Sequence, residues 1–208
     1  MNTIIRGIIL GLSITAPIGP TNIEVIRRGT REGWRSAAAF CLGTIVALIL
    51  FLLLVVAGLS FLTELPAFNA LLTALGVAVL AYLAYISIKD FCHPEAEIDL
   101  DEHANPNQHF VPGILLTISN PAILLIWTGI MGVDLAASRA SVDQGLLLSL
   151  GILIGVGLFF TFLTAVIHYG RRLLRREYLR YVSLAAGVVL LFFCVRFARD
   201  FLIQYVIR

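Results

Sequence analysis

The chain has 208 residues, of which 59% are hydrophobic and 13% are charged, and its formal net charge is +2. The charged share is about half of that in soluble domains, too little to cover a water-facing surface. These values exclude an ordinary soluble domain, and the sequence has no basic face of the kind that binding to nucleic acid requires.

Six apolar segments have the length of roughly 20 residues that is needed to cross about 30 Å of hydrocarbon. We predict spans at 3–26, 36–61, 67–91, 111–134, 144–168 and 181–206. The predicted fold class is an all-α membrane protein with six transmembrane helices. Residues 1–20 have the charge and apolar stretch of a signal peptide. Because the apolar run continues to Ile26, we expect them to belong to the first span.

The first span is interrupted by Pro17, Gly19 and Pro20. Proline removes a backbone donor and clashes with the preceding turn, so a helix ends or kinks there. In lipid, such a break is tolerated only where protein satisfies the freed backbone groups or where they line a cavity. Pro20 suits the first turn of a new half-helix, whose first amides, from Thr21 onward, would lack partners within the helix.

The fourth span is interrupted by Ser119-Asn120-Pro121, in which Asn120 is a good N-cap and Pro121 a good first helical residue. Two half-helices would then begin inside the membrane, with positive dipole ends that attract carboxylates. Paired breaks in corresponding spans indicate the binding site of a carrier. The candidate substrate-binding residues are Thr15, Pro17, Gly19, Pro20, Thr21, Asn22, Ser119, Asn120 and Pro121. The alternative is a pair of structural kinks that neighbouring helices satisfy.

Glu24 follows the first break by four residues and is an ionisable group at membrane depth. Such a group is a functional candidate by default, here for carrying a coupling proton or for binding a substrate's ammonium group. The alternative, an ion pair with Arg27 or Arg28 at the membrane interface, is equally compatible with the sequence.

The third span is followed by a polar, acidic linker at residues 92–110, which divides the chain. The predicted domains are a first three-helix repeat at 1–91, this linker on the cytoplasmic side, and a second three-helix repeat at 111–208. Because each repeat has an odd number of spans, the two would form an inverted repeat, with broken first and fourth helices.

The basic residues are distributed unequally between the two sides of the predicted bundle. Ten lie on the side of the linker, against five on the other side. The positive-inside rule therefore places the linker in the cytoplasm and both termini outside. The ten are Arg27, Arg28, Arg31, Arg35, Lys89, Arg171, Arg172, Arg175, Arg176 and Arg180.

Glycines with small-xxx-small spacing occur as Gly7 and Gly11 and as Gly151 and Gly155. This spacing lets helix backbones approach closely, either within one chain or in a dimer.

Three histidines, His93, His103 and His109, share the linker with several carboxylates. Their spacing matches no tight metal site, so we expect a solvated loop.

No cofactor, metal site or enzymatic activity is predicted. The three cysteines form no CxxC pair, and no HExxH, P-loop or nucleophile elbow stands in a credible context. Without an ATP-binding motif, active transport would have to use an ion gradient or a partner.

The stretch Ala16-Pro17-Ile18-Gly19-Pro20-Thr21-Asn22, followed by Arg27-Arg28-Gly29 and Arg31-Glu32-Gly33, resembles the opening of LysE/RhtB-type amino-acid exporters. Phe110-Val111-Pro112-Gly113 and Ser119-Asn120-Pro121 resemble the fourth span of that family. The resemblance implies a secondary transporter that exports an amino acid or related small metabolite across the bacterial inner membrane, coupled to protons. It also implies a homodimer.

Two positions depart from that family's pattern. Ala122 stands where a Lys often follows Asn-Pro, and Thr44 stands near the usual place of an Asp. The site is therefore less charged than in exporters of basic amino acids. The predicted partners are a neutral amino acid or small carboxylate and membrane lipid, but not nucleic acid. The alternatives are a metal-ion or other solute transporter of the same superfamily, or a non-transporting membrane scaffold.

Overall fold

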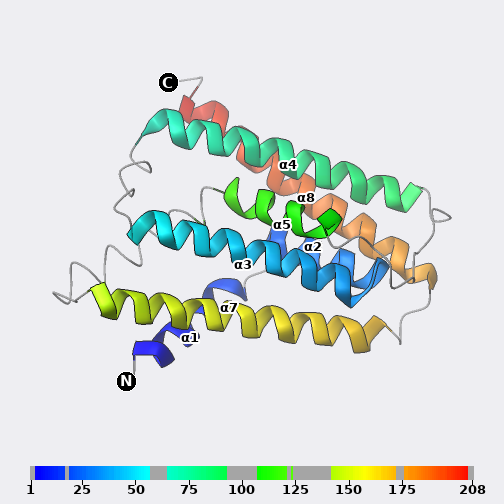
Figure 1. The fold of residues 1–208 in the computed structure, drawn as a ribbon. Coiled ribbons are helices and arrows are strands. Elements are labelled where there is room, and N and C mark those ends of the chain that lie inside the picture. The colour runs from blue at the N-terminus through cyan, green and yellow to red at the C-terminus, as the bar shows by residue number, and fades with distance from the viewer. Residues whose placement is uncertain are drawn as a thin grey trace.

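The computed structural model describes residues 3–16, 19–56, 65–92, 107–120, 123, 142–171 and 176–205. These residues form helices, and none of them lies in a strand (Figure 1). The helices are α1 (Thr3–Thr15), α2 (Pro20–Arg31), α3 (Trp34–Val56), α4 (Pro66–Cys92), α5 (Asn107–Ile118), α7 (Val142–Arg171) and α8 (Arg176–Tyr205).

The helices agree with the predicted spans where the structure describes them. Windows in α3, α7 and α8 are long and apolar enough to cross a membrane: Trp34–Leu54, Gln144–Gly170 and Tyr181–Arg199. α1 and α2 together form a fourth apolar span, bent by 77° at the predicted break. Shorter apolar helices at Thr73–Lys89 and Gln108–Ile118 belong to the third and fourth predicted spans. The chain is thus a helical multi-pass membrane protein.

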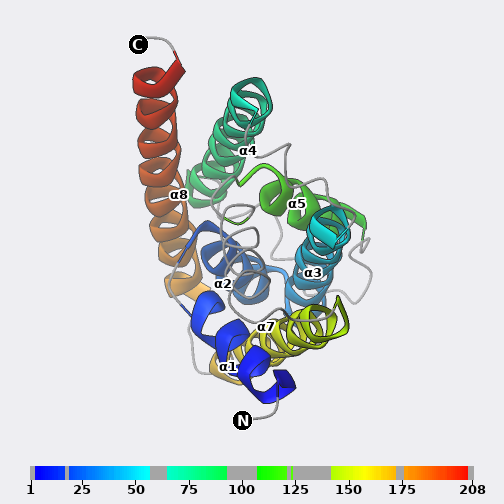
Figure 2. The ribbon, with the colours of Figure 1, turned by 90° about the vertical axis from the view of Figure 1, so that its left-hand side faces the viewer.

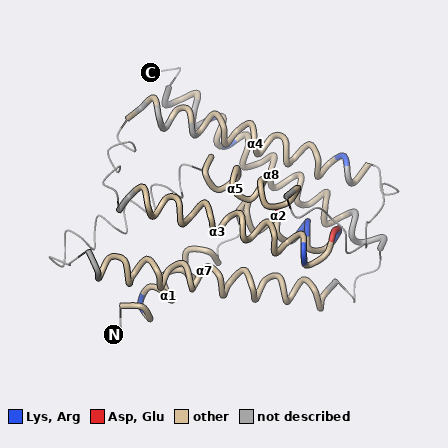
Figure 3. Tube along the Cα trace, viewed as in Figure 1, with Lys and Arg blue, Asp and Glu red and all other residues tan. Residues whose placement is uncertain are grey.

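The ends of the helices are sorted between the two ends of the bundle. In Figure 1, the start of α1 and the end of α8 lie at the same end, as an even number of spans requires. The opposite end holds the turn between α2 and α3, the end of α4 and the end of α7. Basic residues at the ends of α2 and α4 also gather there (Figure 3). This sorting is consistent with the predicted cytoplasmic side.

The short helix α2 lies in the middle of the bundle, and the other helices surround it (Figure 2). It packs against α3, α5, α7 and α8, and nine of its twelve residues are buried. Around it, the most extensive contacts join α1 with α7, α3 with α5, and α4 with α8. The core between these pairs contains fully buried Phe40, Leu80, Leu83, Leu148 and Leu190. α2 is therefore an interior element, although it carries several charges.

Glycines bring two of these helix pairs close together. A Cβ on Gly11 of α1 would collide with the carbonyl oxygen of Ile152 of α7, and one on Gly155 of α7 with that of Ile8. Gly43 of α3 and Gly113 of α5 meet the facing backbone in the same way. The small-xxx-small spacing of α1 and α7 therefore serves a contact within one chain.

The turn after α2 is tight and depends on a glycine. The amide of Glu32 donates to the carbonyl of Arg28 at 2.8 Å and closes the helix. Gly33 follows with φ of 98°, a left-handed conformation that side chains disfavour. α3 then begins at Trp34. The last residues of α2, up to Arg31, are buried among the neighbouring helices.

Candidate functional site

The break in the first span leaves the start of α2 without a side-chain cap. Gly19 is the N-cap in an extended conformation (φ −125°, ψ −178°), and Pro20 is the first helical residue. The first amides of a helix have no acceptor within it. Across the break, Asn22 Nδ2 donates to the carbonyl oxygen of Thr15 at 2.8 Å, which holds the two half-helices together.

A cavity of about 160 Å³ lies at this break. Its walls come from the end of α1, the start of α2, the middle of α3, residues after α5, and α7. The lining residues are Ile14, Thr15, Gly19, Pro20, Thr21, Asn22, Thr44, Leu48, Asn120, Ile123, Ile152, Val156 and Phe160. Segments far apart in sequence thus meet around one small chamber.

Most of the predicted binding residues that the structure describes line this cavity. They are Thr15, Gly19, Pro20, Thr21, Asn22 and Asn120. Ser119 does not: it is buried against Pro20 and Gly76 with almost no open volume, and its hydroxyl donates to the carbonyl of Leu115. Pro17 and Pro121 lie outside the described residues. The breaks in the two halves therefore share a wall of one cavity.

Thr44 is a wall residue that was not among the predicted binding residues, although its position was noted as one near which the related family often has an Asp. Its Oγ1 is buried and has no hydrogen-bond partner among the described residues. A buried polar atom without a partner is rare in native proteins and calls for a ligand or water. A lone hydroxyl in an apolar run was the available signal, but the sequence does not show that it faces the break.

The remaining wall is apolar and comes from Leu48 of α3 and from Ile152, Val156 and Phe160 of α7. The three residues of α7 are spaced four apart and so lie on one helix face. No described lining residue carries a formal charge. The cavity therefore offers neutral polar groups, an apolar wall and the positive end of the α2 dipole, which favours an anionic group.

Glu24 is completely buried one turn beyond the cavity, on α2. Its Oε1 lies 3.0 Å from Nε of Arg27, and its Oε2 lies 2.8 Å from Nε of Arg28. The guanidinium of Arg28 also lies over the ring of Phe40, 5.2 Å from its centroid. The ion pairs weighed as the alternative for Glu24 are therefore present, but in the interior and not at an exposed interface.

His109 differs from the solvated loop residue that its place in the linker predicted. α5 begins at Asn107, and His109 is only 6% exposed. Its Nδ1 lies 2.8 Å from Nη1 of Arg28 and 3.1 Å from Oε2 of Glu32. The difference arises because the helix begins at Asn107, directly after Pro106 and inside the polar stretch, where hydropathy does not mark its start.

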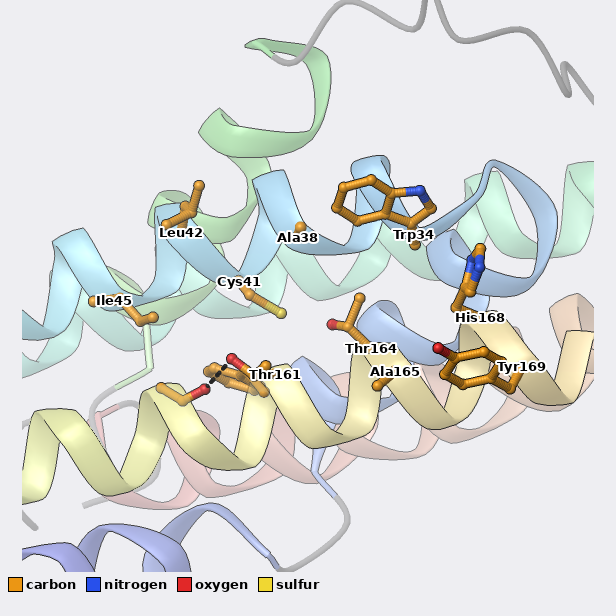
Figure 4. Close-up of a pocket in the computed structure, with 12 residues that line it drawn as sticks. Trp34, Ala38, Cys41, Leu42, Ile45, Thr161, Thr164, Ala165, His168 and Tyr169 are labelled. Carbon is orange, nitrogen blue, oxygen red and sulfur yellow. Dashed lines mark hydrogen bonds between the residues drawn. The ribbon is translucent and has the colours of Figure 1, made fainter.

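A larger groove of about 450 Å³ lies between α3 and α7 (Figure 4). Trp34, His168 and Tyr169 form one end of it, while Cys41, Thr161 and Thr164 lie along its middle. Trp34 and Tyr169 are exposed on the outside of the bundle. Phe160 borders both the groove and the cavity, but the groove contains none of the predicted binding residues.

A metal centre finds no support in the part of the chain that the structure describes. Within it, no group of three or more His, Cys, Asp and Glu side chains is placed to hold an ion. His93 and His103 lie outside the described residues.

Comparison with known proteins bears out the resemblance noted in the sequence. The model of the LysE type translocator family matches residues 12–201. A Bacillus subtilis protein named "Putative amino acid efflux protein YcgF" is 33% identical over 195 residues, 93% of each chain. The protein named "Lysine exporter LysE" from Corynebacterium efficiens is 31% identical over 107 residues, 51% of this chain and 46% of its own length.

An uncharacterized membrane protein of Haemophilus influenzae is 24% identical over 186 residues, 85% of this chain and 87% of its own. No solved structure gives a significant match. Because the family model covers most of the sequence, the chain belongs to the LysE type translocator family.

Proposed function

We propose that this protein is a secondary carrier that exports a neutral amino acid, or a related small carboxylate, across the bacterial inner membrane. The observation that carries the proposal is the cavity at the break of the first span, which is lined both by the start of α2, without a side-chain cap, and by Thr44, whose hydroxyl has no partner among the described residues. Both are features that a bound ligand would satisfy.

The carboxylate of the substrate would bind at the start of α2. Negative groups near a helix N-terminus gain about 0.3–1 kcal/mol, and up to about 2 kcal/mol where they are partly buried. Thr15, Thr21 and Thr44 supply hydroxyl groups beside this position, and Asn120 supplies an amide. The apolar wall of Leu48, Ile152, Val156 and Phe160 would face the side chain of the substrate.

The size and charge of the cavity support a small, neutral side chain. At about 160 Å³ it is smaller than the roughly 300–1,000 Å³ of pockets for drug-sized ligands. The side chain of a lysine or arginine substrate would bring a second positive charge, besides the ammonium group, against a wall whose described residues have no carboxylate. Although one relative is named a lysine exporter, we therefore assign a neutral substrate to this chain.

Alternating access would result from movement of the two three-helix repeats against each other. The helix contacts support an inverted repeat, with α1, α3 and α4 of the first half corresponding to α5, α7 and α8 of the second. If each helix is replaced by its counterpart in the other half, the contact of α1 with α7 becomes the contact of α5 with α3, which is also extensive. The contact of α4 with α8 becomes the contact of α8 with α4 and is unchanged. Both α1–α7 and α3–α5 also meet through glycines, as this correspondence expects.

Glu24 is the candidate for the coupled proton, since it lies one turn from the cavity and a carrier without an ATP-binding motif needs an ion gradient. Its carboxylate is bonded to Arg27 and Arg28 in this structure. To take up a proton it would have to release at least one guanidinium. Proton coupling through Glu24 therefore implies a second conformation in which these ion pairs are rearranged.

The proposal is tested by comparing metabolite release from bacterial cells with and without this protein. Overexpression should lower the cellular retention of at least one neutral amino acid. The double variant Pro20→Ala, Pro121→Ala should abolish that release while the protein remains folded in the membrane. Pro66→Ala, at the start of α4 and outside both breaks, is the matched control and should release normally. Unchanged release by the double variant would contradict the mechanism.

A further inference from the structure

The imidazole of His109 joins α5 to the end of α2 at the end of the bundle where the basic residues gather. It is buried, and its Nδ1 contacts two groups at once, Nη1 of Arg28 at 2.8 Å and Oε2 of Glu32 at 3.1 Å. Its Nε2 is also buried and has no hydrogen-bond partner in the part of the chain that the structure describes.

These two contacts make opposite demands on one nitrogen. A guanidinium is only a donor, so Arg28 requires a lone pair on Nδ1. An ionised carboxylate is only an acceptor, so Glu32 requires a hydrogen on Nδ1. His109 can satisfy one of them at a time, and gaining or losing a proton at Nδ1 decides which.

The charges around His109 come mainly from α2. Arg28 and Glu32 touch it, Glu24 bonds to Arg28, and Arg27 lies 3.8 Å from Glu32 through Nη1 and Oε1. Arg31 on the same helix bonds to Ser183 of α8.

Of the other helices packed against α5, α3 contributes the ring of Phe40 under Arg28, and Lys89 of α4 is exposed. Three arginines and two glutamates give this cluster a net charge of +1 with neutral His109. Protonation of His109 raises the net charge to +2. Burial and the positive charges of Arg28 and Arg27 lower the pKa of His109 to about 4, so its protonation belongs to an acidic range.

We propose that His109 is a proton-binding site that controls the cytoplasmic opening of the carrier, an inference that rests on the proposed function. A proton added to the Nδ1 lone pair forms an imidazolium whose Nδ1–H donates to Glu32. Nη1 of Arg28 then loses its acceptor and is repelled by the imidazolium, while Nε of Arg28 keeps its bond to Glu24. The bond from His109 thus passes from α2 itself to Glu32, in the turn after α2, and the contact between α5 and α2 weakens. Loss of the proton restores the Arg28 bond.

The effect reaches the cavity because the same helix forms both places. Pro20 lines the cavity and Arg28 contacts His109, eight residues later on α2, which is about 12 Å along the helix axis. A shift of the Arg28 end moves the start of α2 as well. Low pH should therefore speed the exchange of substrate, because it loosens the contact between α5 and α2.

The test is exchange of a radiolabelled mixture of neutral amino acids in proteoliposomes, with equal pH on both sides, from about pH 8 down to about pH 4, where the pKa of His109 lies. Without a gradient, proton driving force cannot contribute. The wild-type rate should rise at least threefold as pH falls. His109→Asn, whose amide can occupy the place of Nδ1 without titrating, should exchange at a rate that changes less than 1.5-fold over the range.

His168→Asn is the matched control, a histidine at the same end of the bundle but in the groove between α3 and α7, and it should keep the wild-type response. A pH response retained in His109→Asn, or lost also in His168→Asn, would overturn the inference. So would loss of exchange at every pH in folded His109→Asn and His109→Gln, since the ring would then serve only as structural support.

A second readout does not depend on transport. The folded cluster holds the pKa of His109 below its value in the unfolded chain, so the unfolded chain binds the proton first as pH falls. The melting temperature of the purified wild type should therefore fall by about 2–4 °C more than that of His109→Asn between about pH 8 and about pH 5. Equal falls would contradict the proton site. If this difference appears but no amino acid is exchanged by the wild type, the proposed function fails while the proton site stands.

Discussion

Thr44 illustrates how a single side chain can mark a site at the residue scale. Its hydroxyl lies on the cavity wall without a partner in the described part of the chain, whereas the hydroxyl of Thr15 donates to the carbonyl of Gly11 at 2.7 Å. A hydroxyl that donates to a carbonyl of its own helix, such as that of Thr15, has its hydrogen bond in the folded protein without a ligand. The hydroxyl of Thr44 is the one that binding would complete.

Thr44→Val should weaken substrate binding while preserving the fold, because it replaces the hydroxyl with a methyl group of similar size. The loss of one hydrogen bond, about 1 kcal/mol, corresponds to a rise of roughly fivefold in KM. The matched control is Thr161→Val, which lies in the groove and bonds to the carbonyl of Gly157. Transport kinetics in proteoliposomes measure both, and an unchanged KM for Thr44→Val would place the substrate elsewhere.

Glu24→Gln should destabilise the protein, because it leaves two buried guanidinium groups without their carboxylate. Removing one partner of a buried ion pair costs about 3–5 kcal/mol. For a chain of this length that corresponds to a fall of roughly 10 °C in melting temperature. Thermal unfolding of the purified protein measures it, with Glu32→Gln, whose side chain is 29% exposed, as the milder comparison. Equal melting temperatures for wild type and Glu24→Gln would show that the ion pairs contribute little.

At the scale of elements, the broken first span was predictable and its surroundings were not. Proline acts on the helix that contains it, so Pro20 alone sufficed to predict where α2 begins. Which residues face the break depends on packing across the bundle. α3 and α7 are apolar on all sides, so the pattern of hydrophobic residues does not show that Thr44 and Phe160 face the break, and Thr44 was noted only because the related family often has an Asp near that position.

The burial of the charged residues of α2 was also not predictable from the sequence. Arg27, Arg28 and Arg31 were expected in a loop at the membrane surface, but α2 continues to Arg31 and the bundle encloses it. His109 joins them from α5. Short-range patterns give the position of such residues along the chain, but the structure was needed to show that they are neighbours.

The contact between α1 and α7 depends on glycine. Substitutions at two glycines of α7, Gly155 in the contact and Gly157 outside it, distinguish an effect on packing from an effect on helix propensity. Gly155→Val should prevent the close approach, since even a Cβ there would collide with the carbonyl of Ile8. At Gly157 an added Cβ meets open space, and replacement of Gly157 by valine changes helix propensity by the same amount as Gly155→Val. The first variant should lose most of its folded yield, and the second should purify like the wild type. Equal yields, measured by size-exclusion chromatography in detergent, would contradict the packing.

At the scale of the whole molecule, the sidedness of the basic residues predicts that the end of α4 lies in the cytoplasm. Cys92 ends α4 and is exposed, whereas Cys41 and Cys194 are buried. A membrane-impermeant maleimide should therefore label the protein in inside-out vesicles but not in intact spheroplasts, and Cys92→Ser should abolish the labelling. Labelling from the outside would reverse the predicted orientation. The homodimer that the family resemblance implies stays a prediction.

The central claim is that the start of α2 binds the carboxylate of the substrate in the cavity between the two halves. Competition in proteoliposome exchange tests it most directly, by comparing each neutral amino acid that is exchanged with its carboxamide. The carboxamide keeps the size and the ammonium group but lacks the negative charge. The account predicts that the amino acid competes at least tenfold more strongly, and equal competition by the two compounds would contradict it.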